Sequence, residues 1–222
     1  MPPRTRPVSW VKAALKDFET FPEGATSICL AALTIAAEGG KADIVKPMRG
    51  MGPGVFEIAL PFRGNAFRVV YAVQLADDIW GGPCVPEEVD AGDQDAHARG
   101  RSDQRPFETA EGDVAMKHDT LDVVRGSGNV FRDLEHKNGD AQQFKAILAA
   151  EIIKALDREG LSVRAAHGRT GIAAADFSRI RHADLGRFTV DRLMSIINRL
   201  GSRVEVKVRV RRADTTAHGV SA

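Results

Sequence analysis

Residues 81–115 interrupt this chain and separate two segments whose patterns differ. The segment holds nine acidic and three basic residues, together with three prolines and five glycines. Neither the alternation of a strand nor the apolar stripe of a helix can be drawn through it. We therefore predict that residues 81–115 form an acidic, disordered segment between two folded units.

Charge is distributed unevenly along the chain. Residues 1–80 are nearly balanced, with nine basic and eight acidic side chains, whereas residues 116–222 carry 19 basic and 13 acidic side chains. A basic surplus confined to one part of a chain indicates a polyanionic partner for that part. A solvated basic surface without such a partner is the alternative.

Several classes of protein are not expected from this composition. The longest apolar run, residues 28–37, contains Thr34 and is far shorter than the roughly 20 residues that span a membrane. The first residues contain no apolar stretch typical of a signal peptide. The spacing of Cys29 and Cys84 matches neither a disulfide framework nor a metal site. We predict a cytoplasmic protein with no metal, no cofactor and no membrane partner.

The first unit is predicted to have an α+β fold. Apolar residues at helical spacing predict a helix over residues 8–20 and a second helix over residues 23–38. Two β-branched and aromatic runs, 54–62 and 66–75, are joined by a short turn and predict an antiparallel hairpin. Residues 77–80 start a third strand, which the acidic segment is expected to cut off.

This unit resembles a known family of toxins. The sequences "KPMRGMGPGVFEI" and "FRVVY", preceded by "WVKAALKDFETFPE", are similar to RelE/HigB-type toxins of the phage-derived branch, from Val8 to Trp80. The resemblance implies two helices plus antiparallel strands, and cleavage of mRNA on the ribosome without a metal. By position, the resemblance implies that Lys46, Arg49 and Arg68 hold phosphate. It also implies that Tyr71 lines the site. The alternative is that Arg68 and Tyr71 are ordinary strand residues.

The acidic segment stands where this branch has a strand of the type "V-L-H-A-F-Q-K-K-S". The codons of Gly81 to Glu88, read with one base dropped, permit Val-Val-His-Ala-Phe-Gln-Lys-Lys. We infer that one extra base after Trp80 put the last strand and helix of the toxin out of frame. An ordinary acidic linker is one alternative. An error in the gene sequence is another, and the cell would then make two separate proteins.

The inferred frameshift has a chemical consequence. Catalytic groups that act together lose nearly all activity when some of them are missing. The sequence therefore predicts weak or absent ribonuclease activity. The rival hypothesis is an active endoribonuclease that the fused C-terminal half holds inactive.

The second unit is predicted to be an all-α bundle that ends in a β-strand. Apolar periodicity predicts four helices, over residues 144–156, 163–169, 174–182 and 189–201. Ser162 and Thr189 are placed to cap the second and fourth of these helices, and Gly171 supplies a turn. Valines alternate with charged residues from Val204 to Val210, as in a strand with one apolar face.

The stretch "LSVRAAHGRTGIAAADFSRIR" resembles the Cro/C1-type helix-turn-helix without a gap. The similarity is greatest to HigA-type antitoxins, whose genes follow those of HigB-type toxins, and it covers about Met116 to Arg212. Met116 looks like the original start of a second protein. The resemblance implies an antitoxin that binds DNA and represses its own operon. A helical bundle with no ligand is the alternative.

In this geometry the second helix of the motif enters the major groove. The residues expected on its exposed face are predicted to contact base edges. They are Ala173, Ala174, Ala175, Asp176, Ser178, Arg179 and His182. Four arginines are predicted to contact phosphates, namely Arg164, Arg169, Arg181 and Arg187. Alanine can touch a thymine methyl group but makes no bidentate hydrogen bond, so Ser178 and Arg179 are the best candidates for base recognition.

The predicted organisation has five parts. They are a toxin fragment at 1–80, the acidic segment at 81–115, an N-terminal antitoxin arm at 116–143, the DNA-binding domain with its C-terminal strand at 144–212, and a disordered tail at 213–222. The C-terminal strand is expected to pair across a two-fold axis and form a homodimer. The predicted partners are double-stranded operator DNA and a cognate toxin, with mRNA and the ribosome only if the toxin half is active.

Overall fold

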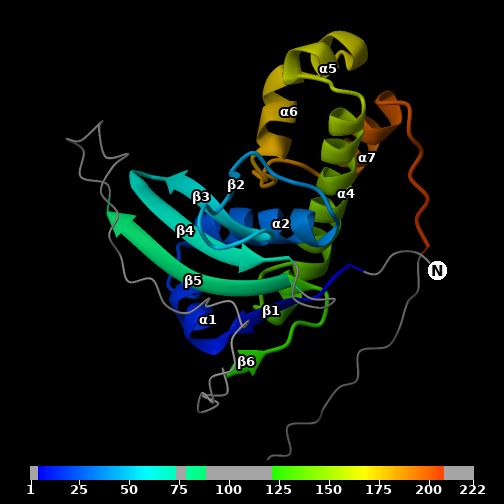
Figure 1. Cartoon of the computed structure of the whole chain (residues 1–222). Coiled ribbons are helices and arrows are strands. Elements are labelled where there is room, and N and C mark those ends of the chain that lie inside the picture. Colours follow the sequence, from blue (N-terminus) through cyan, green and yellow to red (C-terminus); the bar gives the residue numbers. More distant parts are fainter. Residues whose placement is uncertain (1–4, 74–78, 89–121, 208–222) are drawn as a thin grey trace, which may run out of the picture.

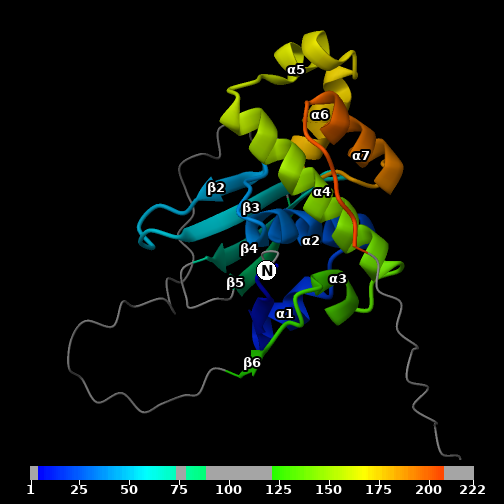
Figure 2. The same cartoon turned by 90° about the vertical axis from the view of Figure 1, so that its right-hand side faces the viewer.

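The structure, a computed structural model, describes residues 5–73, 79–88 and 122–207. It contains an N-terminal region with a mixed β-sheet and a C-terminal helical region (Figure 1). Helix α2 (Glu23–Ala37) lies between the sheet and the long helix α4 (Gly139–Arg158), which Figure 2 shows from the side. Sheet, α2 and α4 thus form three layers.

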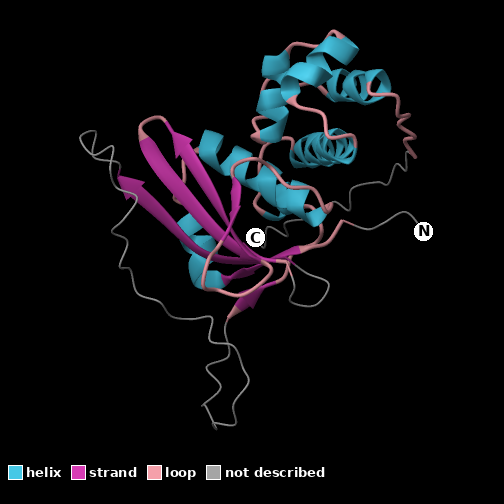
Figure 3. Cartoon of the chain, turned by 45° about the horizontal axis from the view of Figure 1, so that its top comes forward, coloured by secondary structure: helices cyan, strands magenta, loops and turns pink. Residues whose placement is uncertain are grey.

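Six strands make the sheet, in the order β2-β3-β4-β5-β1-β6. Figure 3 draws the strands in magenta. In chain order they are β1 (Val8–Val11), β2 (Val45–Pro47), β3 (Val55–Phe62), β4 (Asn65–Ala72), β5 (Ile79–Glu88) and β6 (Val123–Val124). Strands β1 and β5 run parallel, and all other neighbours are antiparallel. The prediction of antiparallel strands is therefore confirmed only in part, because β1 also joins the sheet and runs parallel to β5.

The β3–β4 hairpin confirms the prediction from the sequence. Its register pairs Val55 with Ala72 at the open end and Phe62 with Asn65 at the turn. The two turn residues, Arg63 and Gly64, have φ angles of 52° and 86°. Positive φ at both positions is the mark of the type I′ turn, whose twist matches that of a hairpin.

The predicted helix over residues 8–20 is wrong in its first four residues. Residues Val8–Val11 form strand β1, and helix α1 covers only Lys12–Phe18. Val8, Ser9 and Trp10 are all buried, and β1 lies inside the sheet between β5 and β6. The apolar spacing of Val8 and Val11 fits a helix equally well, so periodicity alone did not separate the two.

The third strand is not cut off at Trp80. Strand β5 continues to Glu88 and pairs with β4 along its length, while β1 pairs with Ile79 to Gly81 only. Backbone pairing requires main-chain groups rather than particular side chains, and proline is tolerated where a strand has one neighbour. The prediction of disorder is therefore wrong for residues 81–88. The rest of the predicted acidic segment, residues 89–115, lies outside the described residues.

Helix α2 unites the two regions. All residues from Cys29 to Ala37 are buried, so this helix is apolar on every side. Such a helix must be covered on more than one face. The sheet covers one side and α4 covers the other, and the buried side chains of both regions form one continuous core.

The helical region contains five helices. They are α3 (Val130–Asp133), α4, α5 (Val163–Thr170), α6 (Ala174–Arg181) and α7 (Val190–Arg199). The four helices predicted from periodicity are confirmed, although α4 begins five residues before residue 144. Residues 130–143, predicted as an arm, instead form α3 and the start of α4, where Phe131 is only 1% exposed.

The predicted C-terminal strand is absent from the part that can be described. Residues 202–207 have no strand pairing, and Val206 is 49% exposed; residues 208–210 lie outside the described ranges. A strand requires a neighbour for its main-chain groups, and no described strand pairs with residues 202–207. Among the described helices, none is both long and apolar enough to cross a membrane.

Candidate DNA-binding surface

Helices α5 and α6 have the connection that the sequence predicts. The Ser162 hydroxyl oxygen accepts a hydrogen bond of 3.2 Å from the Ala165 N–H and caps α5. Gly171 ends α5 with a φ angle of 69°, in the left-handed region that favours glycine. Between them, Thr170 accepts a hydrogen bond from the Ile172 N–H at 3.3 Å. These bonds fix the turn between the two helices.

The inner face of α6 is held by the core. Ala166, Phe177 and Ile180 are fully buried, and Ile172 is 2% exposed. These are the small and apolar positions on which the resemblance to the helix-turn-helix depends. The opposite face of α6 is therefore turned outward in a fixed orientation.

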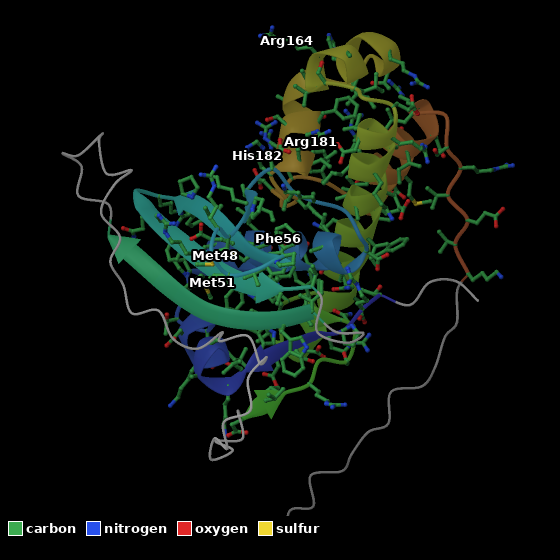
Figure 4. All side chains as sticks on the ribbon, in the orientation of Figure 1. Met48, Met51, Phe56, Arg164, Arg181 and His182 are labelled. Atoms are coloured by element: carbon green, nitrogen blue, oxygen red, sulfur yellow. The ribbon has the colours of Figure 1, made fainter. Side chains whose placement is uncertain are left out.

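The outward face carries the residues predicted to meet bases. Ala173, Ala175 and His182 are exposed, while Ala174, Ser178 and Arg179 are half-buried. Figure 4 shows His182 at the end of α6 that lies nearest the sheet, and Arg164 at the far end of the bundle. The Nδ1 atom of His182 lies 2.7 Å from the Ser178 carbonyl oxygen.

Asp176 is engaged within the protein. Its carboxylate accepts a hydrogen bond of 3.0 Å from Arg192 and forms an ion pair of 3.7 Å with Arg179. Asp176 thus links Arg179 of α6 to Arg192 in the first turn of α7. The contact with Arg192 was not expected from the sequence. The only sequence signal for it is the position of Arg192 three residues after the Thr189 cap, whose hydroxyl accepts from the Arg192 N–H at 3.2 Å.

The four arginines predicted to contact phosphate divide into two pairs. Arg164 and Arg187 are exposed and have no polar side-chain partner in the described part of the chain. Arg169 forms an ion pair with Glu159. Arg181 is only 17% exposed and contacts the carboxylates of Asp157 and Asp43. The structure therefore leaves Arg164 and Arg187 available for a polyanion and places Arg181 in an internal cluster.

The residues predicted for the toxin site are brought together only in part: Lys46 and Arg68 lie on one face of the sheet, on either side of Glu57, whereas Tyr71 does not. Lys46 and Arg49 are exposed, and Arg68 forms an ion pair of 2.8 Å with Glu57. Tyr71 is 2% exposed and stacks on Phe56, with ring centroids 5.7 Å apart.

Strand register explains this separation. Lys46 lies opposite Glu57, and Arg68 lies opposite Ala59, so both cations are on the same face of the sheet. Tyr71 lies three residues beyond Arg68, and the alternation of side chains puts it on the face toward α2. Burial raises the pKa of the Tyr71 hydroxyl above its ordinary value. The expectation that Tyr71 lines the same site as Arg68 is therefore wrong.

Comparisons with known proteins address the helical region. A protein-family model described as a helix-turn-helix domain matches residues 130–209, which include α3 to α7. The match supports a DNA-binding regulator. It begins at α3, and thus includes residues that the sequence alone assigned to an arm. No curated protein and no solved structure matches the chain. Within the described residues, no group of three His, Cys, Asp or Glu side chains could hold a metal ion.

Proposed function

We propose that this chain is a sequence-specific DNA-binding repressor of a type II toxin–antitoxin operon. Its helical region acts as a HigA-like antitoxin, and its αβ region descends from a RelE/HigB-like toxin and does not cleave mRNA. The observation that carries the proposal is the outward face of α6, backed by a buried core and flanked by the free guanidinium groups of Arg164 and Arg187.

The proposed contacts follow from this geometry. Helix α6 enters the major groove, where Arg179 can donate to guanine and Ser178 can bond to either partner of a base pair. Ala174 and Ala175 contact thymine methyl groups, and their small side chains let the helix backbone approach the bases. Arg164 and Arg187 bind phosphates on either side and set the position of the helix.

A titration with DNA tests this proposal. The probes are a duplex from the region immediately upstream of the chain's own coding sequence and a random duplex of equal length. Arg179→Ala is expected to weaken binding to the upstream duplex by about 1–3 kcal/mol and to leave binding to the random duplex nearly unchanged. Arg125→Ala is the matched control, because Arg125 is exposed and lies outside the helix-turn-helix. Equal affinity of the Arg179 variant and the unaltered chain would show that α6 is not the recognition helix.

The absence of ribonuclease activity is supported by the surroundings of Arg68 and by the burial of Tyr71. Cleavage of RNA requires a group for the 2′-hydroxyl and cations for the phosphate at one point. Here Glu57 neutralises Arg68, and Tyr71 is on the opposite face of the sheet. A cleavage assay on mRNA tests this; a rate similar to that of an intact toxin of this type would contradict it.

One observation argues against the alternative, in which the αβ region is a functional ribonuclease and the helical region blocks it. Helix α4 packs on the side of α2 that is turned away from the sheet, as Figure 2 shows. Helices α4 to α7 therefore do not cover the face with Lys46 and Arg68. For the origin of the fusion we propose the frameshift after Trp80, which resequencing of that junction tests.

We further propose a homodimer through residues 204–210. A groove lies between α4, α7 and the C-terminal segment; its lining combines apolar side chains with charged ones such as Glu151, Lys154 and Arg158, and the apolar ones include Phe144, Ile147, Leu148, Ile197, Leu200 and Val204. Pairing of two copies would supply the neighbour that residues 202–207 lack and would space two recognition helices for a palindromic site. Sedimentation at micromolar concentration tests this, and a monomer would contradict it. Binding of a separate cognate toxin remains part of the same proposal.

A further inference from the structure

Arg181, the last residue of the recognition helix, contacts both regions of the molecule. Its Nη2 atom lies 2.5 Å from Asp157 Oδ1 at the end of α4, and its Nη1 atom lies 3.4 Å from Asp43 Oδ1, just before β2. Figure 4 shows Arg181 where the helical region meets the sheet. We call Arg181, Asp43 and Asp157 the Arg181 cluster.

A main-chain bond accompanies this cluster. The Asp43 N–H donates to the Arg181 carbonyl oxygen at 2.7 Å. The last carbonyl groups of a helix have no partner within the helix, and those of α6 must find one elsewhere. The αβ region therefore satisfies one carbonyl at the C-terminus of the recognition helix, besides pairing with its last side chain.

The charge of the cluster argues against a phosphate contact. One guanidinium group faces two carboxylates, so the three side chains together carry a net negative charge. The Arg181 side chain is also only 17% exposed, whereas the carboxylates are 42% and 51% exposed. A phosphate approaching this point meets the carboxylates first. Arg181 thus has the wrong surroundings for the role that its position in the motif suggested.

We propose that Arg181 is a positioning residue that couples the recognition helix to the αβ region, so that the DNA-binding unit extends from the helix-turn-helix to Asp43. This rests on the proposed function, in which α6 binds DNA. The two carboxylates approach the guanidinium from different elements, α4 and the segment before β2. A planar fork of five donors can hold both, whereas the compact ammonium group of lysine cannot reproduce that geometry.

The proposal and a purely electrostatic view predict opposite effects for Asp43→Ala. Removing a carboxylate near DNA strengthens binding if charge alone matters. Removing a support of the recognition helix weakens it. We expect Asp43→Ala, Asp43→Asn and Arg181→Ala each to weaken binding to the upstream duplex about threefold to tenfold, the range set by a partly exposed ion pair.

The experiment uses the full chain, the upstream and random duplexes, and several salt concentrations. Arg181→Ala is expected to leave the slope of affinity against salt unchanged, and Arg181→Lys is expected not to restore affinity. The double variant of Asp43 and Arg181 is expected to bind no more weakly than either single variant. Asp122→Ala is the charge-matched control, since Asp122 pairs with Lys12 and is 71% exposed.

Three results would overturn the proposal. They are a salt slope lowered by about one in Arg181→Ala, the loss expected for one phosphate contact, restored affinity in Arg181→Lys, or unchanged or tighter binding by Asp43→Ala.

Hydrogen exchange without DNA separates this proposal from the proposed function. Asp43→Ala is expected to speed amide exchange at the C-terminal end of α6, and Asp122→Ala is not. If the unaltered chain fails to bind the upstream duplex more tightly than the random one, the proposed function fails, while exchange still decides whether Asp43 supports α6. Unchanged exchange in Asp43→Ala would overturn the positioning role whatever the DNA result.

Discussion

Thr34 and Gln143 meet inside the core, where the Thr34 hydroxyl lies 3.3 Å from the Gln143 Oε1 atom. Thr34 belongs to α2 and Gln143 to α4, so this contact joins residues 109 positions apart in the two regions. The Gln143 amide also donates to the Gly128 carbonyl oxygen at 3.3 Å. The Thr34 hydroxyl also lies 2.9 Å from the Leu30 carbonyl oxygen within α2, so it is Gln143 that finds this buried partner only when both regions are folded together.

The first prediction concerns cooperativity. Gln143→Ala is expected to lower the free energy of unfolding by about 1–3 kcal/mol, because it removes a buried side chain that contacts Thr34 of α2 and donates to the Gly128 carbonyl oxygen. Unfolding in urea is expected to be a single transition, with the fluorescence of Trp10 and Trp80 in the αβ region and the helical circular dichroism changing together. Gln142→Ala, at a half-buried neighbouring position of the same helix, is the control. Two separate transitions would show that the regions fold independently.

The second prediction concerns the turn of the helix-turn-helix. Gly171→Ala is expected to lower the free energy of unfolding by about 1 kcal/mol or more, because φ at this position is 69°. Gly168→Ala is the matched variant, since Gly168 lies inside α5 with open space around its Cα. It is expected to raise stability by about 0.5–1 kcal/mol, because alanine favours a helix interior. Equal effects of the two substitutions would contradict the assigned backbone conformation.

The third prediction concerns pH. Lys145 is buried, with its ammonium group 3.3 Å from the Leu185 carbonyl oxygen, and burial lowers the pKa of this side chain from 10.5. The unfolded state therefore binds more protons than the folded state just below pH 10.5, so this residue makes stability rise with pH in that range. Urea titrations at increasing pH measure this effect. In Lys145→Met, the free energy of unfolding is expected to rise less with pH than in the unaltered chain. Lys137→Met, at an exposed position, is expected to leave the rise unchanged.

Local signals predicted most of the helical region. The Ser162 and Thr189 caps, the Gly171 turn and the inward Phe177 and Ile180 all lie where the sequence placed them. Each of these features depends on residues a few positions apart, so the information is contained in a short stretch of chain. The same holds for the β3–β4 hairpin and its two-residue turn.

Features that depend on distant pairing were missed. Residues Val8–Val11 form a strand because β5 and β6 offer main-chain partners, and no local pattern indicates those partners. Strand β5 persists beyond Trp80 because β4 pairs with it, although its own residues favour a loop. Tyr71 could have been excluded from the site, since strand alternation separates it from Arg68.

By itself, the sequence determined the helices of the DNA-binding region, their caps and the residues on the outward face of α6. Only the tertiary structure decided which of those residues are available, because availability depends on partners far away in the chain. Arg164 and Arg187 stay exposed, whereas Asp43 and Asp157 engage Arg181. The apolar surface all around α2 requires cover on two sides, and the sheet and α4 provide it, so the two regions became one core.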